Sequence, residues 1–192
     1  MSVFKTIAQR RSIGKMTQER PTRAQIERIL EAATHAPNHH NAQPWHFFVL
    51  AGKARIELGE IMARSMLTRL NNAEDEKSHA MLAQERSKPL QAPIVIVAAA
   101  EYPTQEEILE IENIEAVAAA VENMLLTAEE LGLAAMWYSG EAAYGGLVKP
   151  WLGLDEQDHI VAYVYLGYPA LTLQERSPIS FQEKTRWLGW EG

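Results

Sequence analysis

The segment that most constrains the fold is a short apolar run that follows Pro93. Residues Ile94–Ala100 read IVIVAAA, which is too short and too uniformly apolar for an amphipathic helix. The sequence therefore predicts a strand over these residues. Two similar runs, Trp45–Ala51 and Ile160–Tyr168, predict a further buried strand and a last core strand. A fourth strand is predicted over 133–138.

Several segments between these strands have helical character. The clearest predicted helix follows Thr22, whose spacing to Gln25 is that of a capping box, and runs to about His35. The longest predicted helix spans about 105–131, and Gly132 stands where a glycine commonly follows a helix. Further helices are predicted over residues 2–10, 53–70, 73–86 and 141–149.

The chain has 192 residues without an internal repeat, a linker or a low-complexity tract. A chain of this length forms one domain with a substantial core, so we expect a single domain over residues 1–192. Because strands and helices alternate, the pattern indicates a mixed sheet in an α/β or α+β fold.

Charge and composition exclude several functional classes. The net charge of −7 is spread along the chain without a basic block, which argues against nucleic-acid and anionic-membrane binding. The absence of cysteine excludes disulfides, thiolate metal sites and thiol nucleophiles. No apolar run approaches the length of a membrane span, and the N-terminus does not resemble a signal peptide. We therefore expect a soluble, cytoplasmic protein.

Common catalytic and nucleotide-binding motifs are absent. No G-x-G-x-x-G follows a strand, which argues against a Rossmann site, and neither H-E-x-x-H nor G-x-S-x-G occurs. His35, His39 and His40 are close in sequence, but Pro37 breaks the helix between them. No carboxylate or cysteine lies directly beside them in the sequence. We therefore expect no metal site.

Three polar segments are hard to explain by packing, and the first is Arg10-Arg11-Ser12. Two guanidinium groups beside a hydroxyl suit a phosphate, because arginine supplies forked donors and serine a short one. The alternative is a solvated basic turn, which better explains an arginine pair considered in isolation.

The second segment is the loop at residues 37–44, PNHHNAQP, which begins and ends with proline. Its Asn, His and Gln side chains both donate and accept hydrogen bonds, as the edge of a flavin or nucleobase ring demands. An asparagine-rich turn that caps the preceding helix explains the loop equally well.

The third segment, Trp137-Tyr138-Ser139-Gly140, joins a predicted strand to a predicted helix. Backbone N–H groups are free at such a junction, and Gly140 lets a ligand ring approach closely. The alternative is an ordinary turn with core aromatic residues.

Taken together, these segments resemble a known family. The order R-R-S, a helix, A-P-x-x-x-N-x-Q-P-W and a strand is similar to the N-terminal signature of the FMN-dependent nitroreductases. The long helix ending E-L-G-L, the segment before Gly140 and the last strand V-A-Y-V-Y-L-G-Y-P fit as well. Residues 183–187, EKTRW, resemble the C-terminal cationic motif of the family. The resemblance covers nearly the whole chain, and its most specific part is the asparagine-proline loop.

The resemblance implies an α+β fold with a central mixed sheet flanked by helices, in a homodimer that binds FMN at its interface. A C-terminal extension would reach onto the partner subunit. The residues implied to hold the phosphate and ribityl side of FMN are Arg10, Arg11 and Ser12. Those implied to complete the phosphate site are Lys184 and Arg186.

Two further groups of residues are implied to contact the same flavin. The group implied to come from the partner subunit comprises His35, Pro37, Asn38, His39 and Asn41. The group implied to cover one ring face, with backbone N–H groups near atom N5, comprises Trp137, Tyr138, Ser139 and Gly140.

The chain departs from the family in three respects. Many relatives carry lysine two residues after the serine, where this chain has Gly14 followed by Lys15. Asn38 and His39 replace the loop serine that is common in relatives. Because the chain is short, we expect the insertion that covers the substrate site in larger members to be reduced.

The implied activity is electron transfer from NAD(P)H, through FMN, to a nitroaromatic, quinone or enone by a ping-pong mechanism, with no side chain required as a general base. One alternative is a family member with another flavin reaction, such as flavin fragmentation or reductive dehalogenation. Two others are a noncatalytic flavin-binding or sensory protein and a cofactor-free interaction domain. The alanine-rich run 116–120 and the tail residues Trp187 and Trp190 also favour a dimer.

Overall fold

The computed structural model of the protein describes residues 2–71, 75–140, 146–171 and 178–190. Within them the core is a four-stranded sheet in the order β1-β2-β4-β3, and each neighbouring pair is antiparallel. The strands are β1 (Trp45–Ala51), β2 (Ile94–Ala100), β3 (Ala134–Tyr138) and β4 (His159–Gly167).

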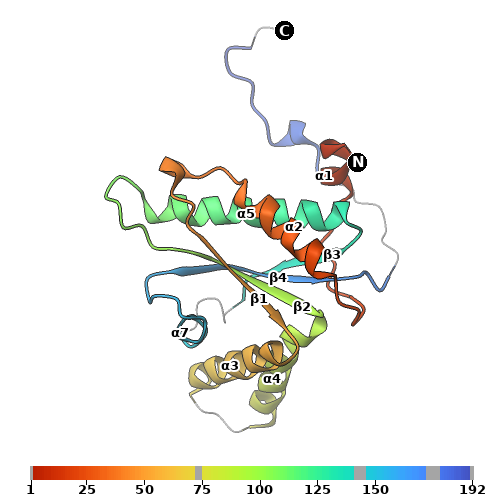
Figure 1. Ribbon diagram of the computed structural model, residues 1–192, viewed down its shortest axis with the longest axis vertical. Coiled ribbons are helices and arrows are strands. Elements are labelled where there is room, and N and C mark those ends of the chain that lie inside the picture. Colours follow the sequence, from red (N-terminus) through yellow and green to blue (C-terminus); the bar gives the residue numbers. More distant parts are fainter. Residues whose placement is uncertain (1, 72–74, 141–145, 172–177, 191–192) are drawn as a thin grey trace.

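Helices cover both faces of this sheet (Figure 1). α2 (Arg23–Thr34) and α5 (Glu110–Glu130) lie on one face, whereas α3 (Lys53–Arg69) and α4 (Glu76–Ser87) lie on the other. The shorter elements are α1 (Val3–Gln9), α7 (Val148–Leu152) and the 3₁₀ turns η1 (His39–Asn41), η2 (Lys88–Gln91) and η3 (Phe181–Glu183). Among the described helices, none is both long and apolar enough to cross a bilayer.

The uniformly apolar run of β2 is explained by its position between two cores. Ile94 and Ile96 pack with α2 and α5, whereas Val95 and Val97 pack with α3 on the opposite face. Because successive side chains of a strand point to opposite faces and both faces are covered, every residue of β2 is buried. The predicted strand is confirmed with the same bounds.

The α+β class and the flanking helices are confirmed, but the sheet is less mixed than expected. β2 and β3 run parallel to each other, as expected for strands joined through a helix such as α5. However, β4 is inserted between them and is antiparallel to both. Among the described residues, parallel pairing is confined to the bridge between Ser12 and Ala135.

Local signals located some elements well and others poorly. The capping box of α2 is present, since Thr22 and Gln25 bond reciprocally, and this helix is confirmed. The prediction that α5 begins at about residue 105 is wrong, because the Glu112 carboxylate accepts the N–H of Leu109 at 2.8 Å and the helix begins at Glu110. Similarly, α4 begins at Glu76 rather than 73, behind the capping side chain of Asp75.

Two further expectations need correction. The strand over Trp45–Ala51 was expected to be buried, but its residues other than Leu50 are partly or fully exposed, because β1 is an outer strand. The helix expected over 141–149 is displaced in the described part: α7 begins at Val148 and runs to Leu152, and the C-cap Gly153 lies in the left-handed region with φ 74°. Residues 141–145 lie outside the described residues.

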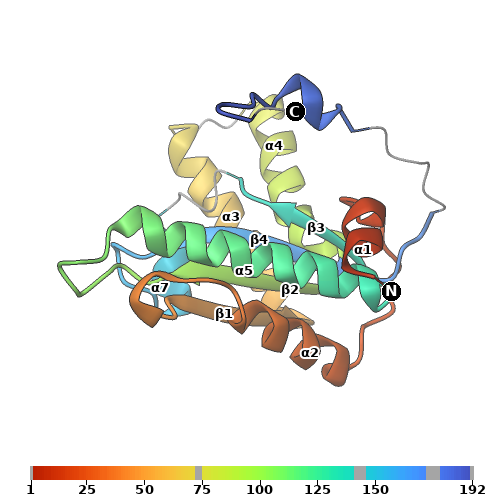
Figure 2. The same cartoon turned by 90° about the horizontal axis from the view of Figure 1, so that it is seen from above.

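Helix α1 exposes most of its large apolar side chains. Val3, Phe4 and Ile7 are 75%, 81% and 47% exposed, whereas Thr6 is the buried residue of the helix. Figure 2 shows α1 at one end of α5. A row of large apolar side chains that no described residue covers is typical of an interaction surface.

The described part of the tail is similarly exposed. Its large apolar side chains are all more than 60% exposed: Ile179, Phe181, Trp187, Leu188 and Trp190. The ring centroids of Trp187 and Trp190 lie 5.6 Å apart, so the two rings contact each other. The expectation that these tryptophans need a covering surface therefore remains, since the described part of a single chain does not bury them.

The crossing of α3 and α4 leads to a prediction about stability. A Cβ atom on Gly59 would lie 2.3 Å from the carbonyl oxygen of Arg86, so Gly59→Ala must push the two backbones apart. We expect a loss of roughly 1–3 kcal/mol in the free energy of unfolding, measured by urea denaturation. Gly146→Ala is the matched control, because no atom lies within 4 Å of its added Cβ. Equal urea midpoints for both variants would contradict the close crossing.

Candidate functional site

The first polar segment lies along the outer edge of β3. Ser12 forms a parallel bridge with Ala135, and the N–H of Ile13 donates to the carbonyl of Ala135 at 3.0 Å. Since β4 occupies the other side of β3, this segment covers the free edge of the sheet. Ser12 is exposed, so its hydroxyl is accessible to a ligand.

Arg10 has a partner that the sequence did not reveal. Its Nε donates to Glu122 Oε1 of α5 at 3.1 Å, and the two side chains are 20% and 43% exposed. An ion pair with this much solvent access contributes at most about 1 kcal/mol, so an incoming anion can compete for the guanidinium. Arg11, beside it, is partly buried.

The third polar segment lies at the other end of the same strand. Ser139 follows Ala135 by four residues, which in a strand is a distance of about 13 Å. Gly140 is tightly packed, because a Cβ there would lie 2.7 Å from Cε1 of Tyr138. Edge strand β3 thus has two arginines and a serine near its start, and Ser139 and Gly140 directly after its end.

The two aromatic residues of this segment lie on opposite faces of the sheet. Trp137 packs against the core under α2 and α5, whereas Tyr138 packs against the core on the α3 side. Their side chains therefore do not form one aromatic wall over a ligand, because neighbouring residues of a strand alternate in direction. Ser139 is exposed at the strand end.

A charged pair that sequence analysis missed lies beside Tyr138. Lys88 forms an ion pair with Glu85, and its Nζ lies 5.3 Å from the centroid of the Tyr138 ring. Burial acts to lower the pKa of Lys88, but hydrogen bonds and charge from Glu85 and Tyr138 outweigh it, so the pKa is raised. Lys88 and Tyr138 are far apart in the chain, and no local pattern indicates their contact.

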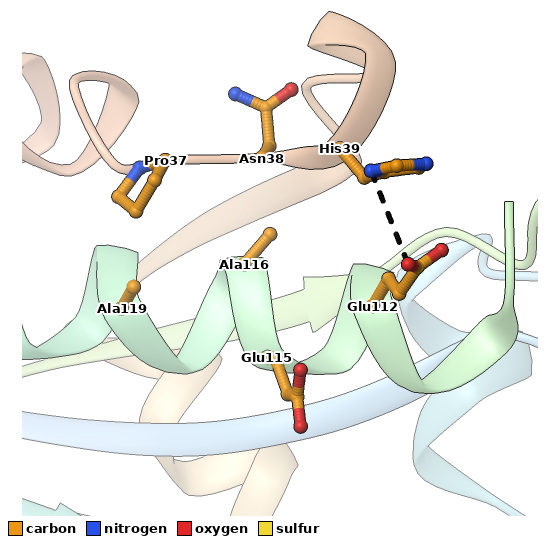
Figure 3. A pocket seen from close by; sticks show the side chains of 7 residues that line it. All are labelled: Pro37, Asn38, His39, Glu112, Glu115, Ala116 and Ala119. Atoms are coloured by element: carbon orange, nitrogen blue, oxygen red, sulfur yellow. Dashed lines mark ion pairs between the residues drawn. The ribbon is translucent and has the colours of Figure 1, made fainter. Parts of the chain in front are cut away.

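Loop residues 37–39 lie over α5 and, together with it, line a cavity of about 400 Å³ (Figure 3). Its wall includes an ion pair between Nδ1 of His39 and Oε1 of Glu112, at 3.9 Å. The residues that line it are Pro37, Asn38, His39, Glu112, Glu115, Ala116 and Ala119. Among the described residues, no three histidine or carboxylate side chains are placed to hold a metal ion.

The backbone of this loop is unusual. His40, Asn41 and Gln43 all adopt the left-handed region, with φ of 48°, 55° and 48°. Such conformations are costly for residues other than glycine and concentrate at ligand-binding sites. Asn38 stabilises the loop, because its Oδ1 accepts the N–H of Gln43 at 2.8 Å. The Asn38 side chain thus has the turn-stabilising role expected of an asparagine-rich loop.

A single chain brings some of the predicted site residues together and leaves others apart. The loop contacts α5 at Glu112, and Arg10 contacts it at Glu122. These two positions are ten residues apart, which is about 15 Å along the helix. His35 is exposed at the C-terminus of α2. Lys184 and Arg186 are exposed, and their side chains make no hydrogen bond or ion pair within the described part of the chain.

Comparison with known proteins identifies relatives of the chain. Residues 7–168 match the model of the nitroreductase family. The Escherichia coli K12 protein named "Putative NAD(P)H nitroreductase YdjA" is 30% identical over 171 residues, which cover 89% of this chain and 90% of that protein. A Desulfovibrio desulfuricans protein crystallised in complex with FMN is 27% identical, with a TM-score of 0.72 over 100% of this chain and 99% of that one. A nitroreductase-like protein from Bacillus cereus, 24% identical, has the same fold, with a TM-score of 0.85 over 98% and 97% of the two chains.

Proposed function

The chain belongs to the nitroreductase family, and from this premise we propose that it is an FMN-dependent oxidoreductase. It passes electrons from NAD(P)H to a small acceptor such as a nitroaromatic, a quinone or an enone. The observation that carries this proposal is the arrangement along edge strand β3. Arg10 and Ser12, which can bind an anion, lie near its start, and Ser139 and Gly140 follow its end, about 13 Å away. This separation fits a ligand with a phosphate at one end, a sugar-alcohol chain and a flat ring.

FMN supplies the redox chemistry when bound, and the residues of the chain bind it and adjust its electronic properties. Arg10 and Ser12 would donate hydrogen bonds to the phosphate. Arg10 would then leave its ion pair with Glu122, because the phosphate is the stronger anion. The backbone N–H groups of Ser139 and Gly140 would donate to the ring. Lys88, beside Tyr138, places a positive charge near the ring site, where it favours negative charge on the reduced flavin.

The proposed site is completed in a homodimer. The exposed apolar side chains of α1 and of the tail support this assembly, because stable dimers bury surfaces of that kind. In the dimer, the loop at 37–41 contributes to the flavin of the partner subunit, and the tail extends onto that subunit. Lys184 and Arg186, which lack partners within the described part of a single chain, then complete the phosphate site.

The connection between β2 and α5 is short, which supports the proposal that the protein uses electron acceptors of varied shape. Only residues 101–109 join these elements, which leaves little chain for a lid over the ring. An uncovered ring face admits either nucleotide or acceptor, one at a time. This is the structural basis we propose for ping-pong kinetics.

The purified protein should be yellow and should release FMN on denaturation. NADH or NADPH should bleach it anaerobically, and a quinone should restore the colour. Initial rates at several acceptor concentrations should give parallel double-reciprocal lines, because both substrates use one ring face. Intersecting lines would instead indicate a ternary complex. A colourless protein that does not bind added FMN would exclude the proposed function, and a yellow one that no nucleotide reduces would indicate a noncatalytic flavin-binding protein.

A further inference from the structure

The ion pair between Glu85 and Lys88 is enclosed by the protein. Their side chains are 10% and 19% exposed, and they belong to the last turn of α4 and the start of η2. Tyr138 lies beside the ammonium, and the ring of Tyr165 lies 5.8 Å from that of Tyr138. Burial raises the pKa of Tyr165, with smaller contributions from Tyr138 and from the charge of Glu85. The pair therefore lies in a poorly solvated, partly aromatic environment at the end of β3.

Stability by itself does not account for this pair. Removing two charges from water costs about as much as their attraction returns, so buried ion pairs stabilise folds little. A neighbouring ion pair already joins α4 to α3, since Arg86 Nε donates to Glu60 Oε2 at 3.0 Å with both side chains about half exposed. The Glu85–Lys88 pair differs from it in facing the strand end where we place the flavin ring.

The charge balance at this strand end indicates a role for Glu85. A free ammonium close to the ring would stabilise negative charge on the reduced flavin, whereas an ammonium paired with a carboxylate does so less. We propose that Glu85 is a positioning residue of the flavin site, which holds Lys88 beside Tyr138 and moderates the effect of its charge on flavin reduction. This inference rests on the proposed function.

The test is the midpoint potential of bound FMN in the holoenzyme. Glu85→Gln should raise it, because the charge of Lys88 is then uncompensated, and Lys88→Met should lower it. We expect each change to alter the ratio of the affinities for reduced and oxidised FMN by about tenfold, which is ~30 mV for a two-electron couple. In a Lys88→Met background, Glu85→Gln should raise the potential less than it does in the wild type, because the part of its effect that comes from positioning Lys88 is then absent.

The matched control is Glu60→Gln, which removes the carboxylate of the neighbouring exposed pair and should leave the potential unchanged. If Glu85→Gln lowers the melting temperature but not the affinity ratio, the pair is structural and the inference is wrong. Potentials that shift in the same direction in both single variants would also overturn it. If Glu85→Gln does not fold, an unchanged midpoint potential in Lys88→Met would show that the inference is wrong. Failure of the proposed function would be seen earlier, as a wild-type protein without FMN.

Discussion

Phe4→Asp is expected to split the proposed dimer into monomers that bind FMN poorly. Phe4 is 81% exposed on α1 in the single chain, between Val3 and Ile7, so the change does not disturb the core of the subunit. A carboxylate in an apolar interface lacks both water and a partner, and the loss of a central aromatic contact typically costs 2 kcal/mol or more. Because a homodimer carries the change twice, we expect about 4 kcal/mol in total, a roughly thousandfold weaker association.

Sedimentation or light scattering at micromolar concentration measures the association, and flavin fluorescence measures the bound FMN. Ile56→Asp is a matched control, because Ile56 is a 53% exposed apolar residue on α3, on the opposite side of the sheet. This variant should remain a yellow dimer. A Phe4→Asp protein that stays dimeric would show that α1 lies outside the interface. A monomer that retains FMN at full affinity would contradict a site shared between subunits.

Arg186→Ala is expected to weaken FMN binding about tenfold to hundredfold while leaving riboflavin binding unchanged. If Arg186 contacts the phosphate in the dimer, the lost charge-assisted hydrogen bond contributes on the order of 1.5–3 kcal/mol. Riboflavin lacks the phosphate and should not be affected. The measurement is a fluorescence titration of flavin-free protein with both ligands. Equal weakening of both ligands would mean that Arg186 supports the fold or the ring site, and no change would remove the tail from the site.

The Arg10–Glu122 contact allows a sharper version of this experiment. Arg10→Ala should also weaken FMN selectively, and combining it with Arg186→Ala should give less than the sum, because both residues serve one phosphate. Glu122→Gln should tighten FMN binding modestly, since it releases Arg10 from its ion pair. If Glu122→Gln weakens FMN instead, the carboxylate orients Arg10 toward the phosphate rather than competing for it.

Several parts of the fold could be predicted from local sequence. The strand Ile94–Ala100 was predicted with its observed bounds, because a run without polar residues suits a strand buried on both faces. The start of α2 was predicted because Thr22 and Gln25 bond within one turn. These features depend on residues close in the chain, whose geometry is largely fixed by backbone stereochemistry.

The polar segments of the candidate site could also be recognised, but not their arrangement. Local composition indicated phosphate-binding side chains near Ser12 and free backbone N–H groups near Gly140. It did not reveal that Ser12 lies along the strand that ends before Ser139, because that depends on the bridge between Ser12 and Ala135. The family resemblance implied that residues 137–140 cover one ring face, and the pleat of the strand places the side chains of Trp137 and Tyr138 on opposite sides of the sheet.

The sequence by itself thus determined the elements, the fold class and the residue types available for a flavin site. Only the tertiary structure decided which of them meet: β4 between β2 and β3, Arg10 on Glu122, and Lys88 beside Tyr138. The physical reason is that periodicity and capping depend on neighbours within a few residues. Contacts between distant residues depend instead on the order in which strands pair and on the faces that helices cover.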